Sequence, residues 1–205
     1  MSVLLSTKVL KKAVDDLSAA DEKLARAIAV VGPCDMVPRT EGSHFDHLTR
    51  NIVYQQLSGA AAGTIHGRFV DRCGDGKTPT PERLLAIDVE TLRSCGLSAA
   101  KVAAIRDLAL HVHDNRLPLD KLESMDDAAI IESLVAVRGI GVWTAQMFLM
   151  FRLGRPDVLP VLDLGVRKGT QRIYRMRKLP DAARLEKTAK TWKPWRSVAS
   201  WYCWR

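Results

Sequence analysis

The sequence predicts an all-α protein, and three observations support that class. Apolar residues recur three and four positions apart along most of the 205 residues, which is the spacing of one helix face. Serine, threonine or aspartate precedes most of these segments, where a side chain can cap a helix N-terminus. No segment alternates apolar and polar residues over the length of a strand.

The first half of the chain is expected to contain helices over residues 4–17, 24–31, 45–56, 60–73, a short stretch after 80, another from 88 to 96, and 98–113. Gly32-Pro33 ends the second of these helices, and Ser43 is the expected N-cap of the third. Thr80 followed by Pro81 marks a helix start, because proline is favoured at the first helical position. Asp88 and Ser98 are the caps expected for the two helices that come after them.

The second half is expected to contain helices over residues 128–136, 142–153, 163–175, 181–192 and 195–204. Asp126 or Asp127 opens the first of these, and Gly154 with Pro156 ends the second. Between these two helices the sequence Gly139-Ile140-Gly141 predicts a tight turn. Glycine permits backbone geometry that other residues avoid, and Ile140 can attach the turn to the core.

Composition narrows the class of protein. Hydrophobic residues make up 47% of the chain, enough for a sizeable core, yet no apolar run approaches the ~20 residues of a membrane span. The apolar N-terminal stretch is too short for a secretory signal, so we expect a soluble intracellular protein. The four cysteines are scattered, with no closely spaced pair, which argues against a zinc site, a disulfide framework and an iron–sulfur cluster.

Positive charge is concentrated in the C-terminal part. Residues 164–205 hold twelve Lys and Arg against two acids, a net +10, which leaves about −2 of the overall +8 for residues 1–163. Such asymmetry favours a polyanionic partner, with nucleic acid first, although a solvated basic surface explains the composition equally well. The glycine turn favours nucleic acid, because it would expose backbone N–H groups at a helix start, where a phosphate can bind.

A family resemblance rests on the glycine turn and on residues C-terminal to it. Gly139-Ile140-Gly141 with Trp143-Thr144-Ala145, and then Asp163, resembles the helix-hairpin-helix DNA glycosylases, most closely the 3-methyladenine DNA glycosylase II branch. Gln55-Gln56-Leu57-Ser58, residues 92–98 and the ending at 196–205 resemble that branch too. The resemblance covers most of the chain. It implies one domain, 1–205, with a helical barrel over about 44–155 that includes the hairpin 137–143, a second lobe from 1–43 and 156–205, and a site in the cleft between them.

The resemblance implies that Asp163 is the catalytic acid. Cleavage of an N-glycosidic bond builds positive charge on the sugar, which an ionised carboxylate stabilises, and a helix N-terminus favours that ionised form. From the residue alone, Asp163 is more typical of an ordinary N-cap. Asp157 is the fallback acid.

Trp143 stands where family members that also cut the DNA backbone carry a lysine. An indole cannot form a Schiff base, so we expect a monofunctional enzyme. In the alkylpurine branch the matching tryptophan stacks on the extruded base, where a cationic base would gain a cation–π interaction. Core packing is the alternative role. Phe45 and Tyr54 are further candidates for the base pocket.

Residues 55–58 lie where family members insert a side chain into the gap left by the flipped base. Leu57 is the preferred plug, because apolar wedges serve this purpose well, and Gln56 is the alternative. Ser58 is expected to touch the opposite base. A plain helix end with Leu57 in the core explains the same residues.

The remaining contacts that the resemblance implies are to phosphate and to a cation. The phosphate candidates are the backbone amides of Gly139, Gly141 and Trp143 and the side chains of Thr144, Ser98, Lys101, Arg167 and Lys168. A monovalent cation would bind the backbone carbonyls of Val135, Val137 and Ile140. No organic cofactor is expected.

We therefore interpret the chain as a monofunctional DNA-3-methyladenine glycosylase of base excision repair, acting as a monomer on double-stranded DNA with alkylated bases. The expected location is the cytoplasm, at the nucleoid in a bacterium, or the nucleus in a eukaryote. A glycosylase for another lesion and a non-catalytic DNA-binding module with the same hairpin are the alternatives. The module would have no use for the acid at Asp163.

Overall fold

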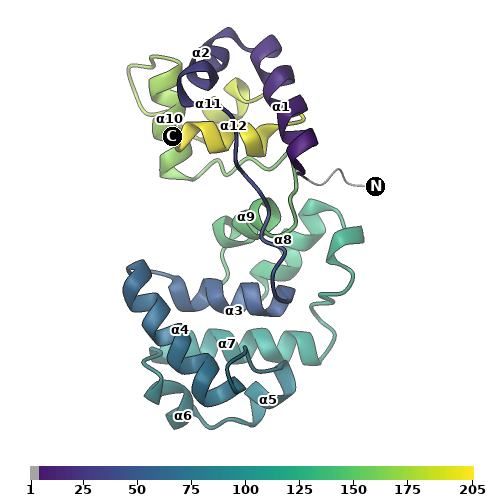
Figure 1. Cartoon of the computed structure of the whole chain (residues 1–205), viewed down its shortest axis with the longest axis vertical. Helices are drawn as coiled ribbons and strands as arrows, with labels where there is room; N and C mark the ends of the chain where they lie inside the picture. Colours follow the sequence, from purple (N-terminus) through teal and green to yellow (C-terminus); the bar gives the residue numbers. More distant parts are fainter. Residues whose placement is uncertain (1–4) are drawn as a thin grey trace. The chain divides into compact units, whose positions relative to one another are not determined.

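The computed structural model describes residues 5–205, which are helical and include no β-strand. The all-α prediction is therefore confirmed. The chain divides into two compact units (Figure 1). Glu41–Ala145 form one, here called the hairpin unit; the residues up to Thr40 form the other, the terminal unit, together with Gln146–Arg205. The division falls inside α9 (Val142–Phe151), whereas the sequence-based estimate placed it after residue 155.

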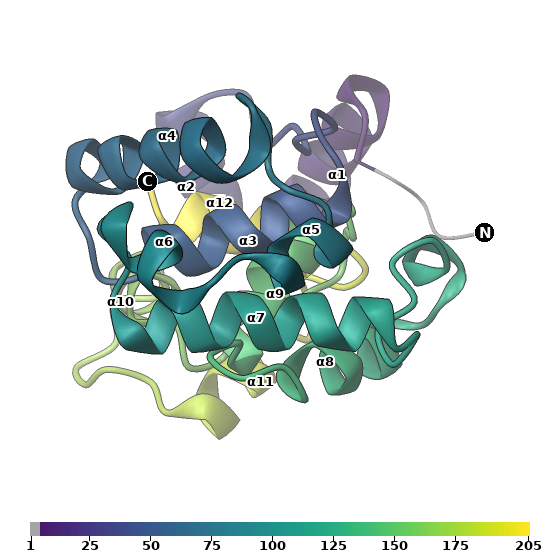
Figure 2. The same ribbon diagram turned by 90° about the horizontal axis from the view of Figure 1, so that it is seen from below.

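The hairpin unit contains α3 (His44–Tyr54), α4 (Gly59–Gly74), α5 (Pro81–Ala86), α6 (Val89–Ser94), α7 (Ala99–His113), the 3-10 helix η1 (Leu122–Ser124) and α8 (Asp127–Val135). Helix α7 packs against α3, α5 and α6, and α4 packs against α3 and α6 (Figure 2). Leu48, Ile52, Phe69, Ile105 and Leu108 are fully buried and form the centre of this core.

The terminal unit contains α1 (Thr7–Ala20), α2 (Glu22–Val31), the later part of α9, α10 (Leu164–Ile173), α11 (Ala182–Thr188) and α12 (Arg196–Cys203). Helix α12 packs against α1, α2 and α10 (Figure 1). The core of the terminal unit includes Leu17, Leu24, Val166, Trp192 and Val198. Trp192, Trp195 and Trp201 are buried, as expected for residues that pack the last helices.

Side-chain caps set most helix starts, as the sequence predicts. The predicted caps Ser43, Thr80, Asp88 and Ser98 each accept a backbone N–H of the first helical turn. Asp126 rather than Asp127 caps α8. Helix α1 starts at Thr7 after the cap Ser6, so the expected start at 4–6 is too early; residue 4 itself lies outside the described part of the chain.

Several helices are shorter than predicted. The helix expected over 181–192 ends at Thr188, because the chain then forms turns in which Trp192 N–H donates to Ala189 O (3.2 Å) and Trp195 N–H to Trp192 O (2.7 Å). The helix expected over 45–56 ends at Tyr54. The 3-10 helix η1 was not predicted. No helix formed by residues 5–205 has the length and apolar character that crossing a membrane requires.

Two glycines on α10 allow α12 to approach it closely. A Cβ added at Gly169 would overlap the backbone carbonyl of Cys203, and one at Gly165 would lie 2.6 Å from Cδ1 of Trp204. Positions four apart lie on one face of a helix, so these glycines form a single smooth contact surface. The close packing of α10 against the end of α12 therefore depends on the absence of side chains there.

This packing predicts opposite effects for two glycine-to-alanine changes. Gly169→Ala should lower the free energy of unfolding by about 1–3 kcal/mol, because the methyl group must displace backbone. Gly67→Ala, in α4 with open space around its Cβ position, should raise it by about 0.5–1 kcal/mol. Urea unfolding followed by circular dichroism measures both. Equal stability of the two variants would contradict the packing described for α10 and α12.

Candidate functional site

The glycine turn is held to the core of the hairpin unit and exposes backbone donors. Ile140 is 3% exposed, and the N–H of Arg138 donates to Asp107 Oδ2 on α7 (2.7 Å). Across the described residues, the N–H groups of Gly139, Gly141 and Val142 have no hydrogen-bond acceptor in the protein. These exposed donors at the start of α9 have the chemistry that binds an anion.

The two glycines of the turn serve different purposes. Gly139 has φ +79, and a Cβ there would lie 3.1 Å from that of Ala104, so conformation and packing both favour glycine. At Gly141 a Cβ would meet open space. Nothing within this unit requires that glycine, so the free space beside it is available to a ligand that approaches the backbone. Thr144, in contrast, is only 8% exposed, and its expected hydroxyl contact to phosphate stays a prediction.

Residues 55–58, here called the wedge loop, connect α3 to α4. Gln56 lies at the exposed apex with φ +57, a left-handed conformation that is uncommon for a residue with a side chain. Leu57 is 38% exposed and not in the core. The Ser58 hydroxyl accepts the N–H of Ala61 (3.3 Å) and caps α4. The loop thus presents two adjacent side chains, Gln56 and Leu57, at the surface.

The wedge loop is attached to the glycine turn and to α7. Gln55 Nε2 donates to Gly139 O (3.0 Å), and Lys101 Nζ donates to Val53 O (2.6 Å) and Gln55 O (2.8 Å). A cation on the last carbonyls of α3 also complements the helix dipole. Lys101 is therefore a structural partner of the wedge loop, and its expected contact with phosphate stays a prediction. Burial lowers the pKa of Lys101, which fits its position over this helix end.

The three aromatic candidates for base contact differ in exposure. Trp143, in the first turn of α9, is 50% exposed, so part of its indole is accessible to a ligand. Phe45 is 5% exposed and packs in the core of the hairpin unit, and its contact with a base stays a prediction. Tyr54 is half-buried, with the Arg50 guanidinium 3.9 Å from its ring centroid and His66 against its edge.

Asp163 is the N-cap of α10, and two donors hold its carboxylate. Oδ1 accepts the N–H of Val166 (2.7 Å) and the indole Nε1–H of Trp204 (2.9 Å). Both donors fix the orientation of the carboxylate at the N-terminus of the helix. Trp204 stacks on Phe151, with ring centroids 5.9 Å apart. The sequence analysis did not predict this contact, although an indole N–H in a packed position needs an acceptor.

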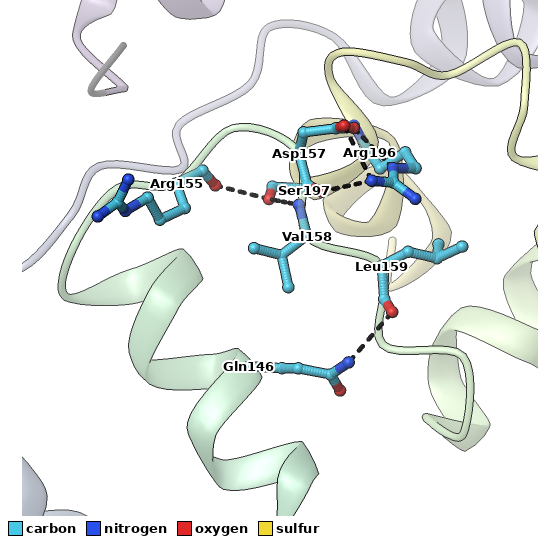
Figure 3. A network of polar contacts seen from close by, with 7 residues as sticks. All are labelled: Gln146, Arg155, Asp157, Val158, Leu159, Arg196 and Ser197. Carbon is cyan, nitrogen blue, oxygen red and sulfur yellow. Dashed lines mark hydrogen bonds and ion pairs between the residues drawn. The ribbon is translucent and has the colours of Figure 1, made fainter. Parts of the chain in front are cut away.

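A polar network holds the segment that leads to Asp163 (Figure 3). Arg196 pairs with both carboxylate oxygens of Asp157, at 2.7 Å and 2.9 Å. Ser197 Oγ donates to Arg155 O (2.7 Å) and accepts the N–H of Val158 (2.9 Å), and Gln146 donates to Leu159 O (3.3 Å). Asp157 is thus committed to Arg196, which removes it as the fallback acid.

A comparison with protein families agrees with this geometry. A model described as "HhH-GPD superfamily base excision DNA repair protein" matches residues 49–194. The chain belongs to the HhH-GPD superfamily. It is 34% identical over 96% of its length to DNA-3-methyladenine glycosylase 1 of Schizosaccharomyces pombe, and the match covers 87% of that relative. It is 33% identical over 95% of its length to the S. pombe alkylbase DNA glycosidase-like protein, of which 92% is covered.

Solved structures of HhH-GPD relatives share the fold. The DNA-3-methyladenine glycosidase of Bacillus halodurans superposes with a TM-score of 0.85 at 38% identity, covering 94% of this chain and 87% of that one. The S. pombe 3-methyladenine DNA glycosylase, solved in complex with abasic DNA, has a TM-score of 0.79 at 34% identity, with 94% and 95% covered.

The other candidates for phosphate contact in this HhH-GPD chain are Ser98, Arg167 and Lys168, and their side chains make different contacts. Ser98 Oγ caps α7 by accepting the N–H of Lys101 (3.3 Å). Arg167 donates through Nε to Pro180 O (2.7 Å), which fixes its guanidinium against the loop after α10. Lys168 is exposed on α10.

Metal binding by side chains has no support in the described residues, where no three His, Cys, Asp or Glu side chains converge. The expected cation site uses backbone carbonyls. One of these, Val137 O, already accepts the N–H of Ile140 (3.1 Å) within the turn. The carbonyls of Val135, Val137 and Ile140 remain a prediction for a monovalent cation, which would neutralise charge beside the turn.

The attachment of the wedge loop predicts local flexibility in one variant. Lys101→Met removes both hydrogen bonds to the end of α3, at a cost of about 1 kcal/mol, because this lysine is partly exposed. Amide hydrogen exchange in residues 55–58 should then accelerate about five-fold. Lys77→Met, at an exposed loop lysine, is the matched control. Unchanged exchange in the wedge loop would show that Lys101 does not hold it.

Proposed function

We propose that this chain is a monofunctional DNA-3-methyladenine glycosylase that hydrolyses the N-glycosidic bond of alkylated purines in duplex DNA. The carboxylate of Asp163, held by Val166 N–H and the Trp204 indole, carries the proposal. Near-full-length similarity to DNA-3-methyladenine glycosylase 1 of S. pombe and to the B. halodurans glycosidase supports it.

The chemistry needs one well-placed carboxylate. When the bond between the sugar and the base breaks, its electrons leave with the base, and positive charge develops on the sugar. The negative charge of Asp163 stabilises that charge and orients the water that adds to C1′, whose proton the carboxylate accepts. A purine that already carries positive charge from alkylation leaves without protonation. A single acid therefore suffices.

Trp143 supports both the substrate class and the outcome. Its exposed indole provides a π surface on which an extruded cationic base can stack, a contact of ~1–2 kcal/mol when water is excluded. The same position lacks the amine that a Schiff base would require. We therefore infer that the product is an abasic site in an intact strand.

The glycine turn and the wedge loop supply DNA binding. The unpaired N–H groups of Gly139, Gly141 and Val142 would hold one phosphate, a contact that positions DNA without reading sequence. The wedge loop would fill the gap in the base stack. The left-handed backbone at Gln56, of order 1 kcal/mol in cost, supports Gln56 as the inserted side chain in place of the sequence-based preference for Leu57.

Removal of the carboxylate charge tests the reaction. Asp163→Asn should slow release of 3-methyladenine from methylated duplex DNA by about 100-fold or more, because the amide cannot stabilise the developing charge. Single-turnover base release measures this, and gel analysis of the same samples should show abasic strands that break only on alkaline treatment. Asp15→Asn, at an exposed acid of α1 in the same unit, is a matched control for loss of an acid, with its thermal stability recorded beside its rate.

Two outcomes would contradict the proposal. Full activity of Asp163→Asn would exclude Asp163 as the catalytic acid. Absence of base release by the unchanged protein, with tight DNA binding, would favour a non-catalytic HhH-GPD module or another lesion.

Truncation of the wedge loop identifies the inserted side chain. Gln56→Ala should weaken binding to abasic duplex DNA by about ten-fold relative to intact duplex, while Leu57→Ala has the smaller effect. Fluorescence anisotropy with the two duplexes measures the ratio. Val89→Ala, an exposed apolar residue of α6, controls for loss of surface area. A larger effect of Leu57→Ala would return the assignment to Leu57.

A further inference from the structure

A pocket of about 470 Å³ lies in the terminal unit, lined by α2, the C-terminal end of α10 and the end of the chain. Its apolar lining, here called the floor, includes the half-buried residues Val31 and Ile173. Besides small and aromatic residues, the rest of the lining contains five basic side chains, from Lys23, Arg26, Arg172, Arg175 and Arg205. We call it the basic pocket. Helices α2 and α10, which both line the pocket, are in direct contact with each other (Figure 1).

Three of the five cations have no carboxylate partner in the described chain: Lys23, Arg172 and Arg175. The other two make loose, exposed pairs, Arg26 with Glu22 (3.6 Å) and Arg205 with Asp35 (3.7 Å). Exposed pairs of this kind contribute little and separate easily. The nearby Asp21 is occupied, because it caps α2 and accepts the hydroxyl hydrogen of Tyr174 (2.6 Å). The pocket therefore presents net positive charge.

Arg175 is held in a conformation that disfavours its side chain. It has φ +51, directly after the C-cap of α10, where glycine is the usual residue. The turn is closed by Arg175 N–H to Arg172 O (3.2 Å) and Met176 N–H to Gln171 O (2.9 Å). A strained non-glycine residue at such a position points to a functional use of its side chain.

We propose that the basic pocket docks an acidic segment of a partner protein, with one apolar side chain seated on the pocket floor. Arginine clusters recognise carboxylates through paired N–H donors, and an apolar centre with a charged rim is the usual composition of a protein interface. Val30, 87% exposed beside this rim, extends the apolar area available to such a segment.

DNA fits the basic pocket less well. Phosphate contacts need donors and charge but gain nothing from an apolar floor. If Asp163 acts on the nucleotide, as the proposed function has it, the pocket lies at the opposite end of the ten-residue α10, about 15 Å along the helix. A partner docked there would leave the reacting end of α10 free.

The test is fluorescence anisotropy of the full chain, without DNA, against a labelled peptide rich in aspartate and glutamate that contains two phenylalanines. A peptide with the acids replaced by their amides is the ligand control. Arg175→Gly removes the guanidinium and suits the left-handed backbone, so the variant should fold at least as well as the unchanged protein. The control variant is Lys11→Gln, which also removes one positive charge. Glutamine is chosen over glycine because Lys11 lies within α1, which a glycine would destabilise.

We expect salt-sensitive binding of the acidic peptide, weakened about ten-fold or more by Arg175→Gly and by Arg172→Gln but not by Lys11→Gln. Duplex DNA affinity and base release should stay unchanged in these variants. Absence of peptide binding, or equal binding of the amide peptide, would overturn the proposal. Weaker binding of duplex DNA by Arg172→Gln and Arg175→Gly would overturn it too, by assigning the pocket to DNA. None of these outcomes depends on whether the chain excises a base.

Discussion

The close contact between α10 and α12 is the constraint on which the candidate catalytic carboxylate depends. Gly165 and Gly169 leave room for the end of α12, and only at that separation does the Trp204 indole reach Asp163 Oδ1. The Asp157–Arg196 pair and Ser197 attach the preceding segment to the start of the same helix (Figure 3). Helix α12 therefore positions the acid from both ends. A carboxylate that is already oriented needs no reorganisation during reaction, which is how fixed charges contribute most to catalysis.

In the hairpin unit, hydrogen bonds between side chains and backbone atoms hold the glycine turn and the wedge loop in place. Gln55 links the wedge loop to the carbonyl of Gly139, Lys101 links it to α7, and Asp107 holds the turn through Arg138 N–H. The elements assigned to phosphate binding and to gap filling thus share one hydrogen-bonded support. In the proposed function, a displacement of the turn on phosphate binding would therefore be passed to the wedge loop through the Gln55–Gly139 hydrogen bond.

Local features of the chain were predictable, and contacts between distant residues were not. Periodicity and caps predicted the helices and Asp163 as the cap of α10, since these depend on neighbours in sequence. Gly139-Ile140-Gly141 predicted the turn, and the resemblance added the role expected for residues 55–58. The roles of Lys101, Asp157 and Trp204 depend on partners about 40 to 50 positions away, and no sequence pattern encodes those partners. The burial of Phe45 was not predictable either, because an aromatic residue near a site has the same sequence signal whether it lines a pocket or fills a core. Gly165 and Gly169 look like helix-weakening residues until the neighbouring helix is known.

A double-mutant cycle on Asp163 and Trp204 tests the central claim that Trp204 acts through the carboxylate. Single-turnover release of 3-methyladenine would be measured for Trp204→Phe, Asp163→Asn and the double variant, with thermal stability recorded for each. We expect Trp204→Phe to slow release when Asp163 is present and to have no further effect in the Asp163→Asn background. Equal slowing by Trp204→Phe in both backgrounds would contradict the claim, because the indole would then contribute independently of the acid.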